Sequence, residues 1–258
     1  MVHAFTVSEQ DFKNLDAVEI KMTVSDAQKD LLRALLPTDL TPKKLWVYFF
    51  DTPDLQLLNT HQVVLRARSK EDKTDDSTVK LRRVEPDWTF SEWRKAEGEF
   101  KVEGDWVSDK LIRSASFSTD QAEGKFERVG AGKDPVDKLF TKEQERFLAE
   151  AINTELDFST LKPLGPIEVY KWKQELPNFD EPMCLEYWQL ANPNDVLQEK
   201  KEILELSTKV ICDRAQIIWE QFNQFLNKHG IDPGAKQAPK TRSALDFFSG
   251  LLQTSKFV

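Results

Sequence analysis

The chain has 258 residues, with 36 lysine and arginine against 44 aspartate and glutamate residues and a formal net charge of −8. Its 40% hydrophobic and 31% charged content is typical of a soluble globular protein. The acidic balance argues against long nucleic acids as the main ligand. The longest strongly apolar run, 45–50, is far shorter than the ~20 residues that a bilayer span needs, so no membrane role is expected.

The N-terminal residues lack the basic and then apolar pattern of a signal peptide. The two cysteines, Cys184 and Cys212, do not have the paired spacing of a disulfide framework or a thiolate zinc site. A reducing compartment suits such a chain. We therefore expect a cytoplasmic protein.

The N-terminal half alternates between apolar and polar residues, as half-buried strands do. Strands are predicted over 17–24, 44–50, 62–68, 77–84 and 97–103. A helix is predicted over 26–36, because Ser25 is a good N-cap and Pro37 ends a helix.

The C-terminal half begins with a less regular stretch, 105–163, which we interpret as a surface excursion that contains one helix, 142–152. Further strands are predicted over 167–175, 183–190 and 202–210, followed by helices over 213–228 and 243–252. Short strands joined by hairpin turns favour an antiparallel sheet or barrel. The prediction is an α+β fold in a single domain, 1–258, with the C-terminal helices in 213–258.

One face of the predicted strands carries long charged side chains. Its cations are Lys21, Arg66, Arg68, Lys80, Arg82, Lys171 and Lys173, and its carboxylates are Glu19, Glu103, Glu186 and Glu205. A solvated outer face is the ordinary explanation of such a pattern. However, like charges two residues apart, as in Arg66 and Arg68, repel each other unless an anion lies beside them. If the sheet closes, the charged face becomes a basic tunnel.

A basic tunnel suits a linear polyphosphate, because guanidinium and ammonium groups form charge-assisted hydrogen bonds with phosphate oxygens. Carboxylates in the same tunnel repel phosphate unless a cation lies between them. They therefore imply a bridging Mg²⁺ or Mn²⁺ with oxygen ligands. The expected partner is a small-molecule triphosphate or polyphosphate.

A set of short motifs, taken together in chain order, resembles the CYTH superfamily of triphosphate tunnel metalloenzymes over residues 17–248. The motifs are Glu19-x-Lys21, Arg66-x-Arg68, Thr78-x-Lys80, Lys101-x-Glu103, Lys171-x-Lys173 and Lys240-Thr241-Arg242. The resemblance implies a closed eight-stranded antiparallel barrel with helices packed outside, and a metal-dependent reaction on triphosphates.

The resemblance also implies roles for these residues. The expected catalytic cations are Lys21, Arg66, Arg68 and Lys80. The expected substrate-binding residues are Arg82, Lys101, Lys171, Lys173 and Arg242, the last from a C-terminal helix that covers one tunnel mouth. The expected metal ligands are Glu19, Glu103, Glu186 and Glu205.

The chain departs from the family pattern at two positions, where Ala17 and Ser207 replace expected carboxylates. Three hypotheses follow. The first is a divalent-metal-dependent phosphohydrolase acting on inorganic or organic triphosphate. The second is a class IV-type adenylyl cyclase on the same fold. The third, which the two departures favour, is a non-catalytic polyphosphate-binding or nucleotide-binding module.

Overall fold

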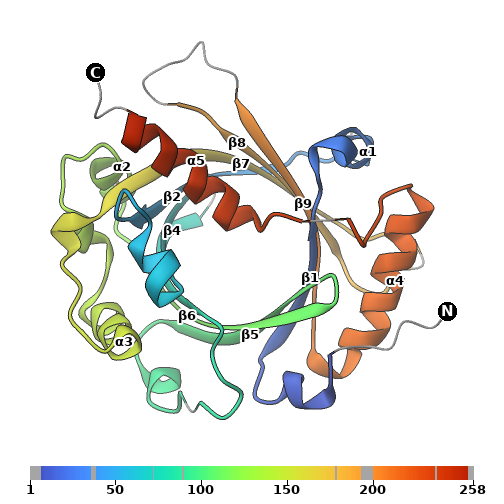
Figure 1. The fold of residues 1–258 in the computed structure, drawn as a ribbon, viewed down its shortest axis with the longest axis horizontal. Helices are drawn as coiled ribbons and strands as arrows, with labels where there is room; N and C mark the ends of the chain where they lie inside the picture. The colour runs from blue at the N-terminus through green and yellow to red at the C-terminus, as the bar shows by residue number, and fades with distance from the viewer. Residues whose placement is uncertain are drawn as a thin grey trace.

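Nine strands close into a barrel in the computed structural model, which describes residues 7–35, 39–71, 73–88, 90–177, 179–192, 200–235 and 237–254 (Figure 1). The strands are β1 (Ala17–Thr23), β2 (Lys43–Asp51), β3 (Val63–Lys70), β4 (Lys73–Arg82), β5 (Glu99–Val107), β6 (Lys110–Asp120), β7 (Lys162–Gln174), β8 (Met183–Leu190) and β9 (Lys201–Val210). Around the barrel their order is β1-β5-β6-β4-β3-β2-β7-β8-β9.

The closed barrel is confirmed, but it is mixed and has nine strands instead of eight antiparallel ones. The additional strand is β6, which lies inside the stretch that we interpreted as an excursion. It pairs antiparallel with both β4 and β5. A ring with an odd number of strands cannot alternate in direction throughout, and the barrel accordingly contains a parallel pair, β1 with β5.

The α-helices are α1 (Lys29–Arg33), α2 (Lys125–Gly130), α3 (Lys142–Ile152), α4 (Ala215–Lys228) and α5 (Lys240–Thr254). Shorter helical segments are η1 (Glu9–Phe12), η2 (Asp26–Gln28), η3 (Leu57–His61), η4 (Trp93–Lys95), η5 (Val136–Leu139), η6 (Phe158–Thr160) and η7 (Cys212–Arg214). Helix α3 has the predicted bounds, whereas α5 begins three residues before its predicted start. No helix in the described ranges is long and apolar enough to cross a membrane.

Helices α2, α3 and α4 lie outside the ring of strands (Figure 1). Alternate residues of β1, such as Val18 and Ile20, form one apolar cluster with Ile218 and Phe222 of α4. On the other side of the barrel, Phe117 of β6 belongs to a cluster that includes residues of α2 and α3. Because the apolar faces pack against outer helices, the charged faces of these strands point into the barrel.

Gln144 fixes α3 on the outside of the barrel. Its buried side chain accepts hydrogen bonds from the hydroxyl groups of Ser77 (3.0 Å) and Thr119 (2.9 Å). It donates to the backbone carbonyls of Ser77 (3.1 Å) and Phe117 (3.0 Å). Thr141 caps the same helix and completes a capping box with Gln144. The helix is therefore attached by a satisfied polar network as well as by apolar contacts.

Helix α5 differs from α2, α3 and α4 because it runs across the opening of the barrel (Figure 1). Its apolar residues Ala244, Leu245 and Phe248 belong to one cluster with residues of β2, β3, β7, β8 and β9. Among these are Val64 and Val169, which lie two residues from Arg66 and Lys171 and so share their inward face. Helix α5 therefore covers part of the barrel interior with apolar side chains.

Candidate functional site

The inward faces of β1 and β5 bring together a cluster of charges around Asp105. The parallel register places Glu19 beside Asp105. The ammonium of Lys21 bridges the two carboxylates, at 2.9 Å from Glu19 Oε2 and 2.6 Å from Asp105 Oδ1. Asp105 Oδ2 also accepts from Lys80 and Arg82, each at 3.3 Å. The Asp105 carboxylate thus forms ion pairs with three cations.

A second pair of carboxylates lies on β8 and β9, where Glu186 is paired with Glu205. The ammonium of Lys240, the first residue of α5, contacts both carboxylates and lies 2.6 Å from Glu205 Oε1. It also lies 4.6 Å from the centroid of the Trp188 ring. Lys171 binds the other oxygen of Glu186 at 2.8 Å. The interior therefore holds two carboxylate pairs, and each is bridged by a lysine.

The hairpin of β3 and β4 carries two arginines that differ in their partners. Arg68 binds Asp76 through two nitrogens, at 3.0 and 2.9 Å. Arg66 donates to the Thr78 hydroxyl, at 3.2 Å, and its buried Nε has no hydrogen-bond partner among the described residues. Within the part of the chain that the structure describes, no carboxylate forms a salt bridge with Arg66. This guanidinium is partly buried, and Asp76, Glu186 and Glu19 offset only part of the lowering of its pKa by burial and by Arg68.

The electrostatics of these side chains divide them into two groups. Burial alone would lower the pKa of Lys21 and Lys240, yet the carboxylates that they bridge raise the pKa of both above its ordinary value. Burial alone would raise the pKa of Glu186, yet Lys240 and Lys171 lower it well below its ordinary value. These ion pairs are therefore fully charged at neutral pH.

The second group is under-compensated. Burial lowers the pKa of Lys80, and Asp105 at 3.3 Å does not offset this effect. Burial and the neighbouring Arg68 lower the pKa of Arg66 to about 9. Both side chains belong to the β3–β4 hairpin, and Arg66 is still a cation at pH 7. A bound anion would supply the negative charge that the Arg66 and Lys80 side chains lack.

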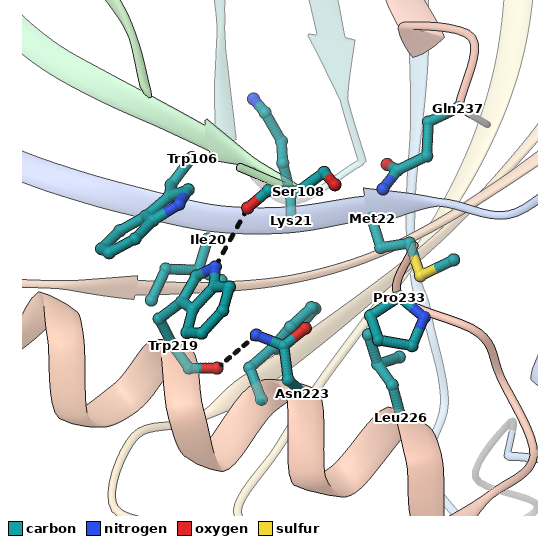
Figure 2. A pocket seen from close by; sticks show the side chains of 11 residues that line it. Ile20, Lys21, Met22, Trp106, Ser108, Trp219, Asn223, Leu226, Pro233 and Gln237 are labelled. Carbon is teal, nitrogen blue, oxygen red and sulfur yellow. Dashed lines mark hydrogen bonds between the residues drawn. The ribbon is translucent and has the colours of Figure 1, made fainter. Parts of the chain in front are cut away.

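The interior also admits solvent. The exposed fraction of the inward-facing side chains around Asp105 ranges from 16% for Lys21 to 33% for Glu19. Figure 2 shows the two faces of β1: Ile20 and Met22 lie toward Trp219 and Leu226 of α4, whereas Lys21 extends to the other side of the strand. The space between β1 and α4 has a volume of only about 10 Å³, room for about one water molecule. Because the two carboxylate clusters and their cations lie on the inward faces of the strands, we place the candidate site inside the barrel.

The structure does not bring every predicted site residue into these clusters. Glu103 binds Lys209 at 2.5 Å, and Lys101 binds Glu99 at 2.6 Å. Lys173 is exposed. Arg242 binds Asp246 at 2.9 Å and Asn59 at 2.7 Å on the outer side of α5. The predicted residues that do lie in the clusters are Glu19, Lys21, Arg66, Arg68, Lys80, Arg82, Lys171, Glu186 and Glu205.

Three functional candidates escaped the sequence prediction: Asp76, Asp105 and Lys240. Asp105 shares the face of Lys101 and Glu103, but it falls beyond the predicted end of that strand. Asp76 directly precedes a predicted strand and pairs with Arg68 across the hairpin. Lys240 was part of the motif that ends in Arg242, yet only the position of α5 shows that it enters the interior.

The four predicted metal ligands do not form one site. Across the described segments of the chain, no three histidine, cysteine, aspartate or glutamate side chains gather at a position that could hold a metal ion. Glu186 and Glu205, however, already converge on one positive charge, the Lys240 ammonium. Magnesium is often held by one or two carboxylates, with phosphate and water as its other ligands. This pair therefore fits a divalent cation that takes the place of the ammonium.

Comparisons with known proteins support the fold. No family model matches the sequence, and no curated protein matches it. A "putative adenylate cyclase" from Bacillus halodurans is similar in structure, with 15% identity, a TM-score of 0.54, and coverage of 88% of this chain and 96% of that one. HpAC1 from Hippeastrum, a "putative adenylyl cyclase" with a dominant triphosphatase activity, shows 17% identity, a TM-score of 0.53, and coverage of 84% and 91%. At these identities the likeness establishes the shared barrel fold, which the resemblance to the CYTH superfamily predicted.

Proposed function

We propose that the protein binds the triphosphate group of an inorganic or organic triphosphate inside the barrel and hydrolyses it with the help of Mg²⁺ or Mn²⁺. The observation that carries this proposal is Arg66, a partly buried guanidinium that forms no salt bridge with a carboxylate of the described residues and whose buried Nε has no hydrogen-bond partner among them. A linear polyphosphate supplies several negative charges along one line and so compensates Arg66, Arg68 and Lys80 together. The triphosphatase activity of HpAC1, a protein of the same fold, agrees with this proposal.

In this mechanism the side chains of the β3–β4 hairpin bind and orient the phosphate chain. Arg66 and Arg68 donate to phosphate oxygens, and Lys80 adds a third positive charge. Asp105 keeps Lys21, Lys80 and Arg82 in position, because each of them binds one of its oxygens. Cations fixed before the substrate arrives stabilise the charge that develops on the transferring phosphoryl group without further reorganisation.

Glu186 and Glu205 are the residues that would hold the divalent cation. When bound, the cation supplies positive charge beside the phosphoanhydride and helps to align it for in-line attack. Asp105 is less suited to a metal because three cations, Lys21, Lys80 and Arg82, bind its two oxygens. The proposal therefore places a single cation at Glu186 and Glu205. It does not use all four glutamates that the sequence predicted as metal ligands.

The test is a phosphate-release assay with inorganic triphosphate, thiamine triphosphate and ATP, each with Mg²⁺ and with Mn²⁺. Arg66→Met is expected to lower kcat/KM by the equivalent of about 2–5 kcal/mol, the range for removing one partner of a buried charged contact. The matched control is Arg128→Met, which removes an exposed guanidinium that pairs with Asp134 on the outside of the barrel.

Two outcomes would replace this proposal. Tight triphosphate binding without phosphate release under any metal condition would identify a binding module, the hypothesis that Ala17 and Ser207 favour. Formation of cyclic AMP and pyrophosphate from ATP would identify an adenylyl cyclase. Equal activity of Arg66→Met and the wild type would show that the substrate does not contact the β3–β4 hairpin.

A further inference from the structure

Lys240 occupies the position at which the proposed function needs a divalent cation. Its ammonium contacts Glu186 and Glu205, and the exposed fractions of the three side chains are 13%, 15% and 7%. Trp188 completes the enclosure, since its indole nitrogen donates to Glu186 Oε2 at 3.1 Å and the ammonium lies over its ring. This lysine is thus an internal counter-ion for two buried carboxylates.

The position of Lys240 depends on the docking of α5, because Lys240 is the first residue of that helix. Ala244, Leu245 and Phe248 anchor the helix to inward-facing apolar residues of the barrel. Just before the helix, the side chain of Gln237 accepts a hydrogen bond from the backbone N–H of Thr23 on β1, at 3.1 Å. The ammonium and the N-terminal turn of α5 are therefore fixed together.

We infer that Lys240 and a divalent cation compete for Glu186 and Glu205, so that cation binding releases the N-terminal turn of α5. This inference rests on the proposed function. The two positive charges would need the same carboxylate oxygens, and at that distance they would repel each other strongly. The cation can enter only when the ammonium leaves. Because α5 covers part of the interior, arrival of the cation is coupled to opening of the site.

The coupling must be reciprocal: if Lys240 weakens cation binding by some factor, the cation weakens the docking of Lys240 by the same factor. Couplings of this kind usually amount to a 5- to 150-fold change in affinity. The prediction therefore has two independent readouts, the affinity for a cation alone and the protection of the first turn of α5.

The first readout is the affinity of the purified full chain for Mn²⁺ without substrate, measured by isothermal titration calorimetry. Lys240→Met is expected to bind Mn²⁺ about 5- to 150-fold more tightly than the wild type. Lys240→Arg keeps the competing charge and is expected to stay near the wild-type affinity. Lys142→Met is the matched control, because Lys142 is also the first residue of a helix and binds Glu145 at 2.6 Å on the outer surface.

The second readout is amide hydrogen exchange of residues 243–247, whose N–H groups donate to the first turn of α5 and to Pro239 just before it. Mn²⁺ is expected to accelerate exchange there in the wild type and to have little effect in Glu205→Gln. Equal Mn²⁺ affinities of Lys240→Met and the wild type would overturn the inference, while the proposed function would stand if Glu205→Gln still weakened binding. Unchanged Mn²⁺ affinity in the double variant Glu186→Gln, Glu205→Gln would instead refute the cation position and, with it, the competition.

Discussion

Asp105 offers a direct test of the charge cluster on β1 and β5. Its side chain is only 3% exposed and accepts from Lys21 at 2.6 Å and from Lys80 and Arg82 at 3.3 Å. Asp105→Asn keeps the shape of the side chain and removes its charge. Lys21 would retain Glu19, whereas the other two cations would lose the carboxylate that each of them binds.

Removing one partner of a buried ion pair costs about 3–5 kcal/mol, because the remaining charge stays buried without compensation. This is a large part of the 5–15 kcal/mol that usually separates a folded domain from its unfolded state. For a chain of this size each kcal/mol corresponds to about 2–4 °C in Tm, so we expect Asp105→Asn to lower Tm by about 6–20 °C.

The effect should depend on pH in a defined direction. Burial alone would raise the pKa of Asp105, but Lys21, Lys80 and Arg82 lower it below its ordinary value. A carboxylate whose pKa is lowered by folding stabilises the folded state at pH values above its pKa in the unfolded chain, which is about 3.9 for aspartate. This stabilisation is lost as the pH falls toward the pKa that the group has in the folded chain. The difference between the wild type and Asp105→Asn should therefore be largest above about pH 5 and shrink in acid.

Thermal denaturation at neutral pH measures the change in Tm. Urea denaturation at neutral and acidic pH, followed by tryptophan fluorescence, measures the free energy of unfolding and its pH dependence. The control is Asp246→Asn, which removes a 49% exposed carboxylate from its pair with Arg242. Such surface pairs usually contribute no more than about 1 kcal/mol. The interpretation of Asp105 fails if its replacement costs no more than that of Asp246, or if the difference persists unchanged in acid.

Three further predictions concern the same interior and its covering helices. Arg66→Met should raise Tm in the absence of anions, because it removes a partly buried charge that forms no salt bridge with a carboxylate in the described ranges. The same change should weaken triphosphate binding in calorimetry, and a lower Tm would contradict this. Phe248→Ala should cost about 3–5 kcal/mol and accelerate hydrogen exchange throughout α5, and unchanged exchange would show that the apolar contact does not dock the helix. Gln144→Leu should destabilise the chain in urea by at least the 1–3 kcal/mol typical of one unpaired buried polar group, since it leaves several groups on the barrel unpaired.

Much of the barrel was predictable because strand alternation is a local property of the chain. The predicted strand 183–190 coincides with β8, and helix 142–152 coincides with α3. Strand β6 was missed although Ala115 and Phe117 alternate with small inward-facing serines in its sequence. The pattern was present, but serine occupies positions where neighbouring strands carry long charged side chains, so the segment looked irregular.

The difference between Lys240 and Arg242 shows how the phase of a helix decides a role. Successive residues of an α-helix are rotated by about 100°, so two residues that are two positions apart point in nearly opposite directions. With Lys240 inside the barrel, Arg242 has to lie on the outer side of α5, where it binds Asp246 and Asn59. The motif Lys240-Thr241-Arg242 identified the start of the helix, but it could not show which of its side chains faces the interior of the barrel.

The sequence by itself determined that one face of the strands is charged and the other apolar, because that alternation is written residue by residue. Only the tertiary structure decided how the charges are neutralised. Asp105 meets Lys21 because β1 and β5 are parallel neighbours, and Lys240 meets Glu186 and Glu205 because α5 folds back across the barrel. Lys240 and Glu186 are 54 positions apart in the sequence, and Asp105 and Lys21 are 84 positions apart. Coulomb interactions depend on distance in space and on burial, and neither is encoded in local spacing.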